Sequence, residues 1–127
     1  MAHRLTFVLM VALVCAGAMG CDKSDVGTCC KVLDGRDPML IPVPKMTDRG
    51  EWIDDISLDP AFDCENLTCV SYQGSNAYCT QKCAFDDSCP KDFKCVPVIA
   101  SDPGPGSNLG PDDKFCVREV VQFACEE

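Results

Sequence analysis

Twelve cysteines carry most of the chemistry available to this 127-residue chain. Ten of them lie beyond residue 28: Cys29, Cys30, Cys64, Cys69, Cys79, Cys83, Cys89, Cys95, Cys116 and Cys125. A cysteine can form a disulfide, ligate a metal or act in redox chemistry, and spacing helps to distinguish these uses. No two of the ten have the two-residue separation with which neighbouring thiolates hold zinc or an iron–sulfur cluster, or form a thioredoxin-type motif. We therefore expect ten disulfide-bonded cysteines of unknown pairing, with no metal and no cofactor.

The other side chains that could support catalysis are sparse or poorly placed. Histidine, the usual partner of a nucleophilic serine or cysteine, occurs once, at His3. Acidic residues are adjacent at Asp54–Asp55, Asp86–Asp87 and Asp112–Asp113. Glycoside hydrolysis needs two carboxylates about 5–10 Å apart facing one substrate, whereas adjacent side chains in extended chain point in opposite directions. We expect no enzyme activity, and the alternative is a glycan hydrolase that uses carboxylates alone.

The amino-terminal twenty residues have the pattern of an export signal. Arg4 supplies the positive charge and residues 5–14 the apolar stretch. The small side chains of a processing site follow at Ala16, Gly17, Ala18 and Gly20. The apolar stretch is shorter than the roughly 20 residues that span a bilayer. Cys21 follows directly, and this arrangement resembles that of bacterial lipoproteins, which are cleaved before the cysteine and acylated on its sulfur and new amino terminus. Such cleavage would also remove His3.

Cysteine parity favours lipidation of Cys21 over ordinary secretion. Ordinary secretion would use the small residues Ala16-Gly17-Ala18 for cleavage and leave eleven cysteines, one of them unpaired. If Cys15 leaves with the signal and Cys21 is acylated, ten remain and all can pair. We therefore expect an extracytoplasmic protein held by a lipid at Cys21 to a bacterial membrane, inner or outer, with a freely secreted protein as the alternative.

The composition of the mature chain restricts its partners and its fold. Without residues 1–20 the chain has 10 basic and 20 acidic residues, a net charge of −10. This balance argues against binding to nucleic acid or to anionic lipid head groups, and it favours cationic partners. Ten cysteines in about 107 residues is the density of a disulfide scaffold in an oxidising compartment. Because large apolar residues are few, disulfides must supplement a small core.

The expected architecture is a small disulfide-rich domain with short β-strands, a hairpin and long irregular loops, and with little helix outside the signal peptide. The chain divides into a signal peptide (1–20), a lipidated tether (21–28), an irregular segment rich in proline and aspartate (29–63) and a disulfide-rich domain (64–127).

Strand signals are clearest in the last segment. Residues 68–73 and 77–80 are β-prone and flank the turn residues 74–76, which predicts a hairpin. Residues 93–99 predict another strand, placed at a sheet edge because Pro97 lacks an amide donor.

The remaining segments give weaker signals. Residues 115–123 fit a helix or a strand, and we prefer a strand. Residues 101–113 are rich in proline and glycine and predict an exposed loop. The apolar residues between 52 and 58 suggest a short turn of helix over the core. Vicinal Cys29 and Cys30 are expected to bond two separate partners, because a ring between adjacent cysteines is strained.

One stretch resembles a known family. Its shared elements are Cys79-Thr-Gln-Lys-Cys83, a short acidic turn, and Cys89-Pro-Lys-Asp-Phe-Lys-Cys95. These are similar to small cysteine-rich modules in envelope lipoproteins of myxobacteria and related deltaproteobacteria, sometimes grouped with the cysteine-rich region of the Dickkopf family. The resemblance covers residues 64–116, with Cys116 as the closing cysteine. It implies a disulfide-stapled scaffold without known catalysis and with structural or binding roles.

Together these observations predict a non-enzymatic lipoprotein of the bacterial cell envelope. Its domain would serve a structural role or contact an unidentified protein or polysaccharide. The alternative is a freely secreted inhibitor or toxin-like factor that uses residues 101–113 as its binding loop.

Overall fold

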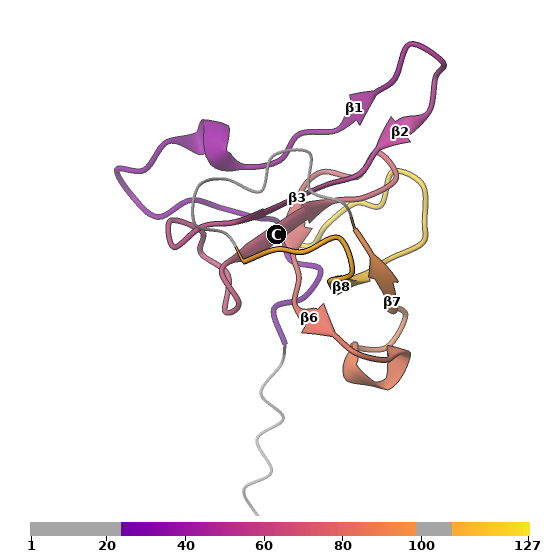
Figure 1. Ribbon diagram of the computed structural model, residues 1–127. Helices are drawn as coiled ribbons and strands as arrows, with labels where there is room; N and C mark the ends of the chain where they lie inside the picture. The colour runs from indigo at the N-terminus through magenta and orange to yellow at the C-terminus, as the bar shows by residue number, and fades with distance from the viewer. Residues whose placement is uncertain (1–23, 99–107) are drawn as a thin grey trace, which may run out of the picture.

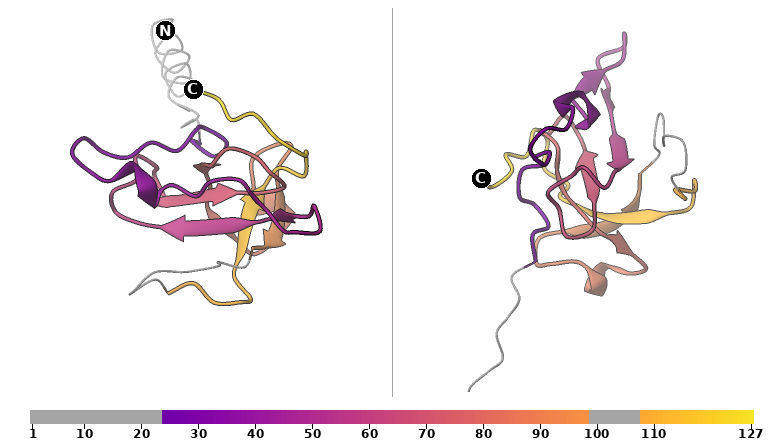
Figure 2. Two further views of the ribbon diagram at one scale, coloured as in Figure 1. Left: turned by 90° about the horizontal axis from the view of Figure 1, so that it is seen from above. Right: turned by 90° about the vertical axis from the view of Figure 1, so that its left-hand side faces the viewer.

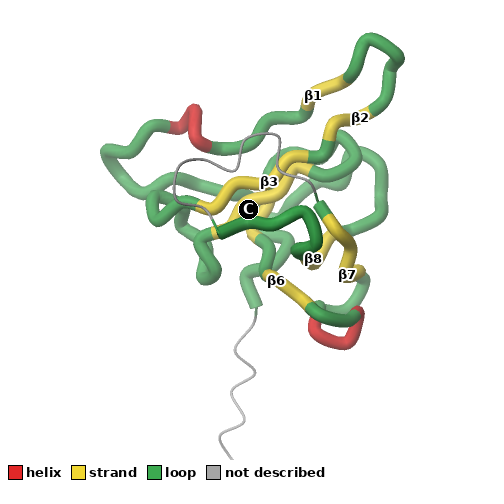
Figure 3. Tube along the Cα trace, viewed as in Figure 1, coloured by secondary structure: helices red, strands yellow, loops and turns green. Residues whose placement is uncertain are grey.

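Short strands joined by long loops make up the computed structural model, which describes residues 24–98 and 108–127 (Figures 1 and 3). The elements in chain order are η1 (Pro38–Leu40), β1 (Lys45–Met46), β2 (Trp52–Ile53), β3 (Asp55–Leu58), β4 (Thr68–Ser71), β5 (Tyr78–Cys79), β6 (Lys82–Cys83), η2 (Asp86–Ser88), β7 (Lys94–Pro97) and β8 (Lys114–Val117). Both helices are single 3₁₀ turns. The expected class, a small disulfide-rich β domain with little helix, is confirmed for this part of the chain. None of its helices is long and apolar enough to cross a membrane.

The strands form three small antiparallel sheets, with the orders β1-β2, β3-β4-β5 and β6-β8-β7. The predicted hairpin is confirmed as β4 and β5. Its tight turn centres on Gln73 and Gly74, which both have positive φ, and the Ser75 amide donates to the Tyr72 carbonyl at 3.0 Å. Positive φ at both central residues is the feature of the turn type that matches the twist of paired strands.

The middle sheet has one covered edge and one open edge. Next to β5, Cys29 forms an antiparallel bridge with Tyr78, and the Cys79 amide donates to the Thr28 carbonyl at 2.8 Å. Thr28 in turn bridges Glu126 near the carboxyl end. On the other side, β3 pairs only with β4 among the named strands of the described chain. Within the described residues, β3 is therefore an edge strand of this sheet.

Several local predictions can be compared with the structure. β7 lies at an edge of its sheet with Pro97 as its last residue, as predicted. Within residues 115–123 the strand assignment is confirmed only at the start, where β8 ends at Val117. Residues 99–107 of the expected loop lie outside the described chain, and residues 108–113 contain no helix or strand and are largely exposed.

The predicted helical turn between residues 52 and 58 is wrong. Trp52 pairs with Met46 of β1, and residues 55–58 pair with residues 68–71 of β4. The pairing partners of residues 55–58 are ten or more residues further along the chain, so a local apolar pattern could not reveal them. Tertiary pairing outweighed the local preference.

Two clusters of buried residues form the core. The first surrounds the sulfur atoms of two disulfides: Cys30, Phe62, Cys64, Cys69, Ala77 and Cys79. The second joins the middle sheet to β8: Ile56, Val70, Tyr78, Val98, Phe115 and Val117. Tyr78 is fully buried and makes edge-to-face contacts with the rings of Phe93 and Phe123. Such pairs add about 0.5–1.5 kcal/mol each beyond the area they bury.

All ten cysteines of the described chain are paired. The disulfides are Cys29–Cys125, Cys30–Cys69, Cys64–Cys79, Cys83–Cys95 and Cys89–Cys116, with Cα separations of 5.0–6.1 Å. The vicinal cysteines bond separate partners, as expected. Two of the five bonds, together with the β3–β4 pairing, join the segment before Cys64 to the segment after it.

Candidate binding surface

The predicted site residues beyond Cys21 are the cysteines, and the structure brings seven of them together in two groups: Cys30, Cys64, Cys69 and Cys79 in the first, and Cys83, Cys89 and Cys95 in the second. In the first group, the Cys64 sulfur lies 3.7 Å from that of Cys30 and 3.9 Å from that of Cys69. The second group brings the sulfurs of Cys83, Cys89 and Cys95 within 4.8 Å of one another. Because every one of these sulfurs is in a disulfide, their chemistry here is cross-linking. Cys21, the predicted lipidation site, lies outside the described residues.

Members of the aspartate pairs that sequence analysis considered for catalysis take part in local hydrogen bonds. An oxygen of Asp54 accepts a hydrogen bond from the Gln73 amide at 2.8 Å, which ties β2 to the turn between β4 and β5. An oxygen of Asp86 accepts from the Cys95 amide at 2.9 Å, and the other lies 3.7 Å from Lys94 Nζ. Both carboxylates therefore hold turns in place.

Asp113 holds the approach to β8 in the same way. Its Oδ2 accepts from the Gly110 amide at 2.7 Å and lies 2.9 Å from Lys82 Nζ. The Gly110 hydrogen bond, and then the lysine, lower the pKa of this carboxyl below its ordinary value. Each of the three aspartate pairs thus has at least one member engaged by the backbone or by a lysine.

Exposed apolar side chains are concentrated in one stretch of the chain. Ten large hydrophobic residues of the described chain are exposed, and six of them lie in the stretch that leads into and forms β3: Leu33, Met39, Leu40, Val43, Met46 and Leu58. Met39 is 88% exposed. A concentration of exposed apolar side chains on a small soluble domain indicates an interaction surface.

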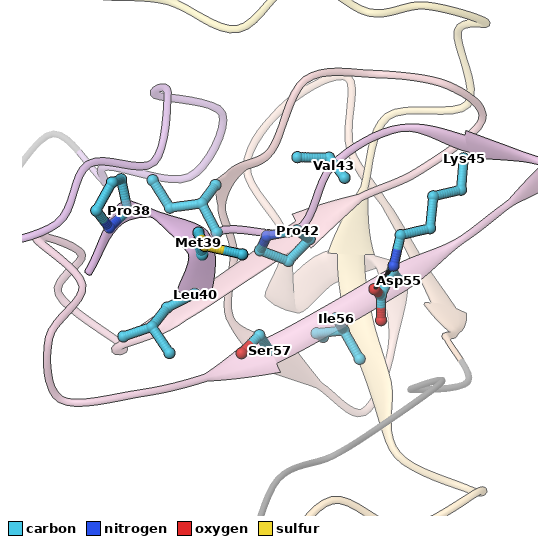
Figure 4. A pocket seen from close by; sticks show the side chains of 10 residues that line it. Pro38, Met39, Leu40, Pro42, Val43, Lys45, Asp55, Ile56 and Ser57 are labelled. Atoms are coloured by element: carbon cyan, nitrogen blue, oxygen red, sulfur yellow. Dashed lines mark ion pairs between the residues drawn. The ribbon is translucent and has the colours of Figure 1, made fainter.

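Three of these residues, Met39, Leu40 and Val43, line a groove along β3 (Figure 4). We call residues 38–45 the strip, and the hollow between the strip and β3 the β3 groove. Its volume is about 490 Å³, and its lining residues are Pro38, Met39, Leu40, Ile41, Pro42, Val43, Lys45, Asp55, Ile56 and Ser57. The strip forms one wall and β3 the other.

Three anchors fix the strip in place. Ile41 packs against the first core cluster, and Pro42 is buried. At one end of the groove, Lys45 Nζ lies 3.8 Å from Asp55 Oδ2. At the other end, Asp37 Oδ1 accepts a hydrogen bond from the Met39 amide at 2.9 Å and caps the turn η1. Ile41 and Lys45 therefore tie the strip to the rest of the fold, and Asp37 orders its first turn.

The prolines of the strip explain why it does not pair with β3. Pro38, Pro42 and Pro44 have no amide hydrogen, so the strip cannot form a regular ladder. Among the described residues, no backbone hydrogen bond joins the strip to Ile56 or Leu58. The edge of β3 thus remains available beside an apolar wall.

No protein-family model, curated protein or solved structure matches the chain. The resemblance of residues 64–116 to envelope modules accordingly stays a prediction.

Sequence reasoning missed the β3 groove. The signals were present: Pro38, Pro42 and Pro44 mark a strand-like segment that cannot pair, and exposed Met39 and Val43 stand between them. They could be interpreted only after β3 was known, because the second wall of the groove comes from a different part of the chain.

Proposed function

We propose that this chain is a non-enzymatic lipoprotein of the bacterial cell envelope that presents a small disulfide-stapled domain to a binding partner. The domain itself is of the kind stabilised by disulfides in extracellular proteins, with five bonds in the described residues. The lipid anchor and the binding role are the proposed parts.

One observation carries the anchoring proposal: the cysteines after the tether form a closed set. All ten pair with one another, so none is left to bond Cys21. The twelfth cysteine, Cys15, lies within the predicted signal. Cys21 directly follows that signal, which is the position of the acylated residue in lipoproteins. Two or three acyl chains, at about 0.8 kcal/mol per buried methylene, would hold the protein at the membrane.

The arrangement of the domain suits presentation away from such an anchor. The described chain begins at one end of the molecule, where the indigo ribbon meets the grey trace, and the β1–β2 hairpin lies at the other end (Figures 1 and 2). The strip runs from η1 to β1, toward the hairpin end, in the same views. A tether attached before Ser24 would therefore leave the groove facing a partner rather than the membrane.

The decisive experiment is intact mass and lipid analysis of the protein produced in a bacterial host with its own signal. We expect an amino terminus at Cys21 with acyl groups attached and the protein in the membrane fraction. The control is Cys21→Ser, which should appear unacylated and soluble with the same five disulfides. An unacylated wild-type product that begins at Met19 would establish ordinary secretion and refute the anchor.

A further inference from the structure

We infer that the β3 groove binds an extended basic peptide segment of a partner protein, which pairs with β3 as an added strand. This inference deepens the proposed function by naming the partner class at the presented surface. It does not depend on the lipid, so a failure of peptide binding and a failure of acylation would be separate results.

The direction of the β3 hydrogen bonds identifies the groups that a peptide would meet. The Asp59 amide donates to the Leu67 carbonyl at 2.9 Å, just beyond the last residue pair of the β3–β4 ladder, Leu58 with Thr68. In an antiparallel ladder, hydrogen-bonded and non-hydrogen-bonded pairs alternate. The backbone groups of Leu58, and of Ile56 two residues earlier, therefore point away from β4 and toward the open edge.

These outward groups match the requirement for strand addition. Main-chain hydrogen bonds to an exposed edge supply affinity in this binding mode, and neighbouring pockets supply specificity. The four residues of β3 span about 13 Å, enough for an added strand of about four residues. The exposed side chains of Met39 and Val43 on the strip offer apolar contacts to alternate residues of such a peptide.

Charge indicates that the peptide is basic. At the end of the groove where Lys45 lies, its charge is balanced by Asp55. At the other end, Arg36 and Asp37 precede the lining residue Pro38 and Asp59 directly follows β3, so these three residues leave one negative charge in excess. Across the whole mature chain the net charge is −10. Complementary charge would speed encounter with a cationic segment and disfavour acidic competitors.

The test uses the mature Cys21→Ser protein and a blocked heptapeptide of alternating lysine and valine. We expect saturable binding at low salt, with chemical-shift changes of the Ile56 and Leu58 amides in nuclear magnetic resonance spectra. A peptide with glutamate in place of lysine should bind at least tenfold more weakly. Equal binding of the two peptides would overturn the charge argument.

A matched pair of variants tests the strand geometry. Leu58→Pro removes one outward amide while leaving the hydrogen bonds to β4, and Leu58→Ala keeps that amide. Loss of one hydrogen bond corresponds to about tenfold in affinity. We expect that loss in the proline variant relative to the alanine variant. Equal affinities of the two variants would overturn strand addition.

A peptide control covers the case in which Leu58→Pro does not fold. N-methylation of every second peptide amide should abolish binding when the methylated amides are those that face β3. Methylation of the other alternate set should leave binding unaffected. Three other results would overturn the inference. The first is slow hydrogen exchange of the Leu58 amide in the free protein, and the second is a change in the chemical shifts of groove residues on dilution, which would show that a second copy occupies the edge. The third is chemical-shift changes caused by the neutral glycan maltohexaose and not by the peptide.

Discussion

Gly74 is a position where a single methyl group should have a large effect on stability. It has a φ of 78° at the centre of the turn between β4 and β5. A Cβ added there would lie 2.5 Å from Cε2 of Trp52, closer than any unstrained contact. Gly74→Ala therefore introduces two costs, one from the backbone conformation and one from the clash with the indole ring.

The two costs can be separated with a matched control. Gly50 has nearly the same φ, 81°, but a Cβ added there meets no atom within 4 Å. Gly50→Ala should lower the free energy of unfolding by about 1–2 kcal/mol, the cost of a left-handed backbone for a residue with a side chain. Gly74→Ala carries that cost and a further overpacking cost of about 1–3 kcal/mol. The effect of alanine on the unfolded chain is common to both and cancels in the difference.

The assay is guanidinium unfolding followed by circular dichroism, with all disulfides oxidised. Trp52 is the only tryptophan, so its fluorescence independently reports a displaced ring. In a Trp52→Ala background the cost of Gly74→Ala should fall to that of Gly50→Ala, since no ring remains to clash. Equal costs for the two glycine substitutions in the wild-type background would refute the packing of Trp52 on the turn.

Two further predictions concern pH and cross-linking. Burial raises the pKa of Tyr78 to about 12. The folded state therefore gains its full stabilisation from the neutral phenol below pH 10 and loses up to about 2–3 kcal/mol of unfolding free energy as the pH rises toward 12. Phenolate absorbance of a Tyr72→Phe variant measures the pKa of Tyr78, and ionisation of Tyr78 at pH 10 in the folded protein would contradict the prediction. Removing the Cys29–Cys125 disulfide with two alanine substitutions should cost about 3.6 kcal/mol rather than the about 4.7 kcal/mol of an isolated 96-residue loop, because the other four bonds already shorten the path between the two cysteines. Guanidinium unfolding checks this value, and an unchanged midpoint would show that the bond does not constrain the unfolded chain.

The sequence predicted the features that depend on neighbouring residues. The hairpin of β4 and β5 follows from β-prone residues around Gly74, and the edge position of β7 follows from Pro97. Separate partners for Cys29 and Cys30 follow from ring strain between adjacent cysteines. Each of these rests on the covalent geometry of a few consecutive residues.

Features that depend on distant residues were not predictable. The pairing of Cys29 with Cys125 spans 96 residues, and cysteine spacing carries no information about it. β3 was mistaken for helix because its hydrogen bonds go to β4. The groove needs both β3 and the strip, so it could not be recognised before the two were placed side by side.

The Cys29–Cys125 disulfide also has a topological consequence. It closes the polypeptide between these two residues into a covalent ring. One cleavage by a protease anywhere inside this ring leaves both fragments attached, with only the mass of one water added. If the chain is anchored at Cys21, as we propose, a single cut can release the domain only on the amino-terminal side of Cys29. Residues 22–28 would then be the segment at which a protease could shed the domain intact.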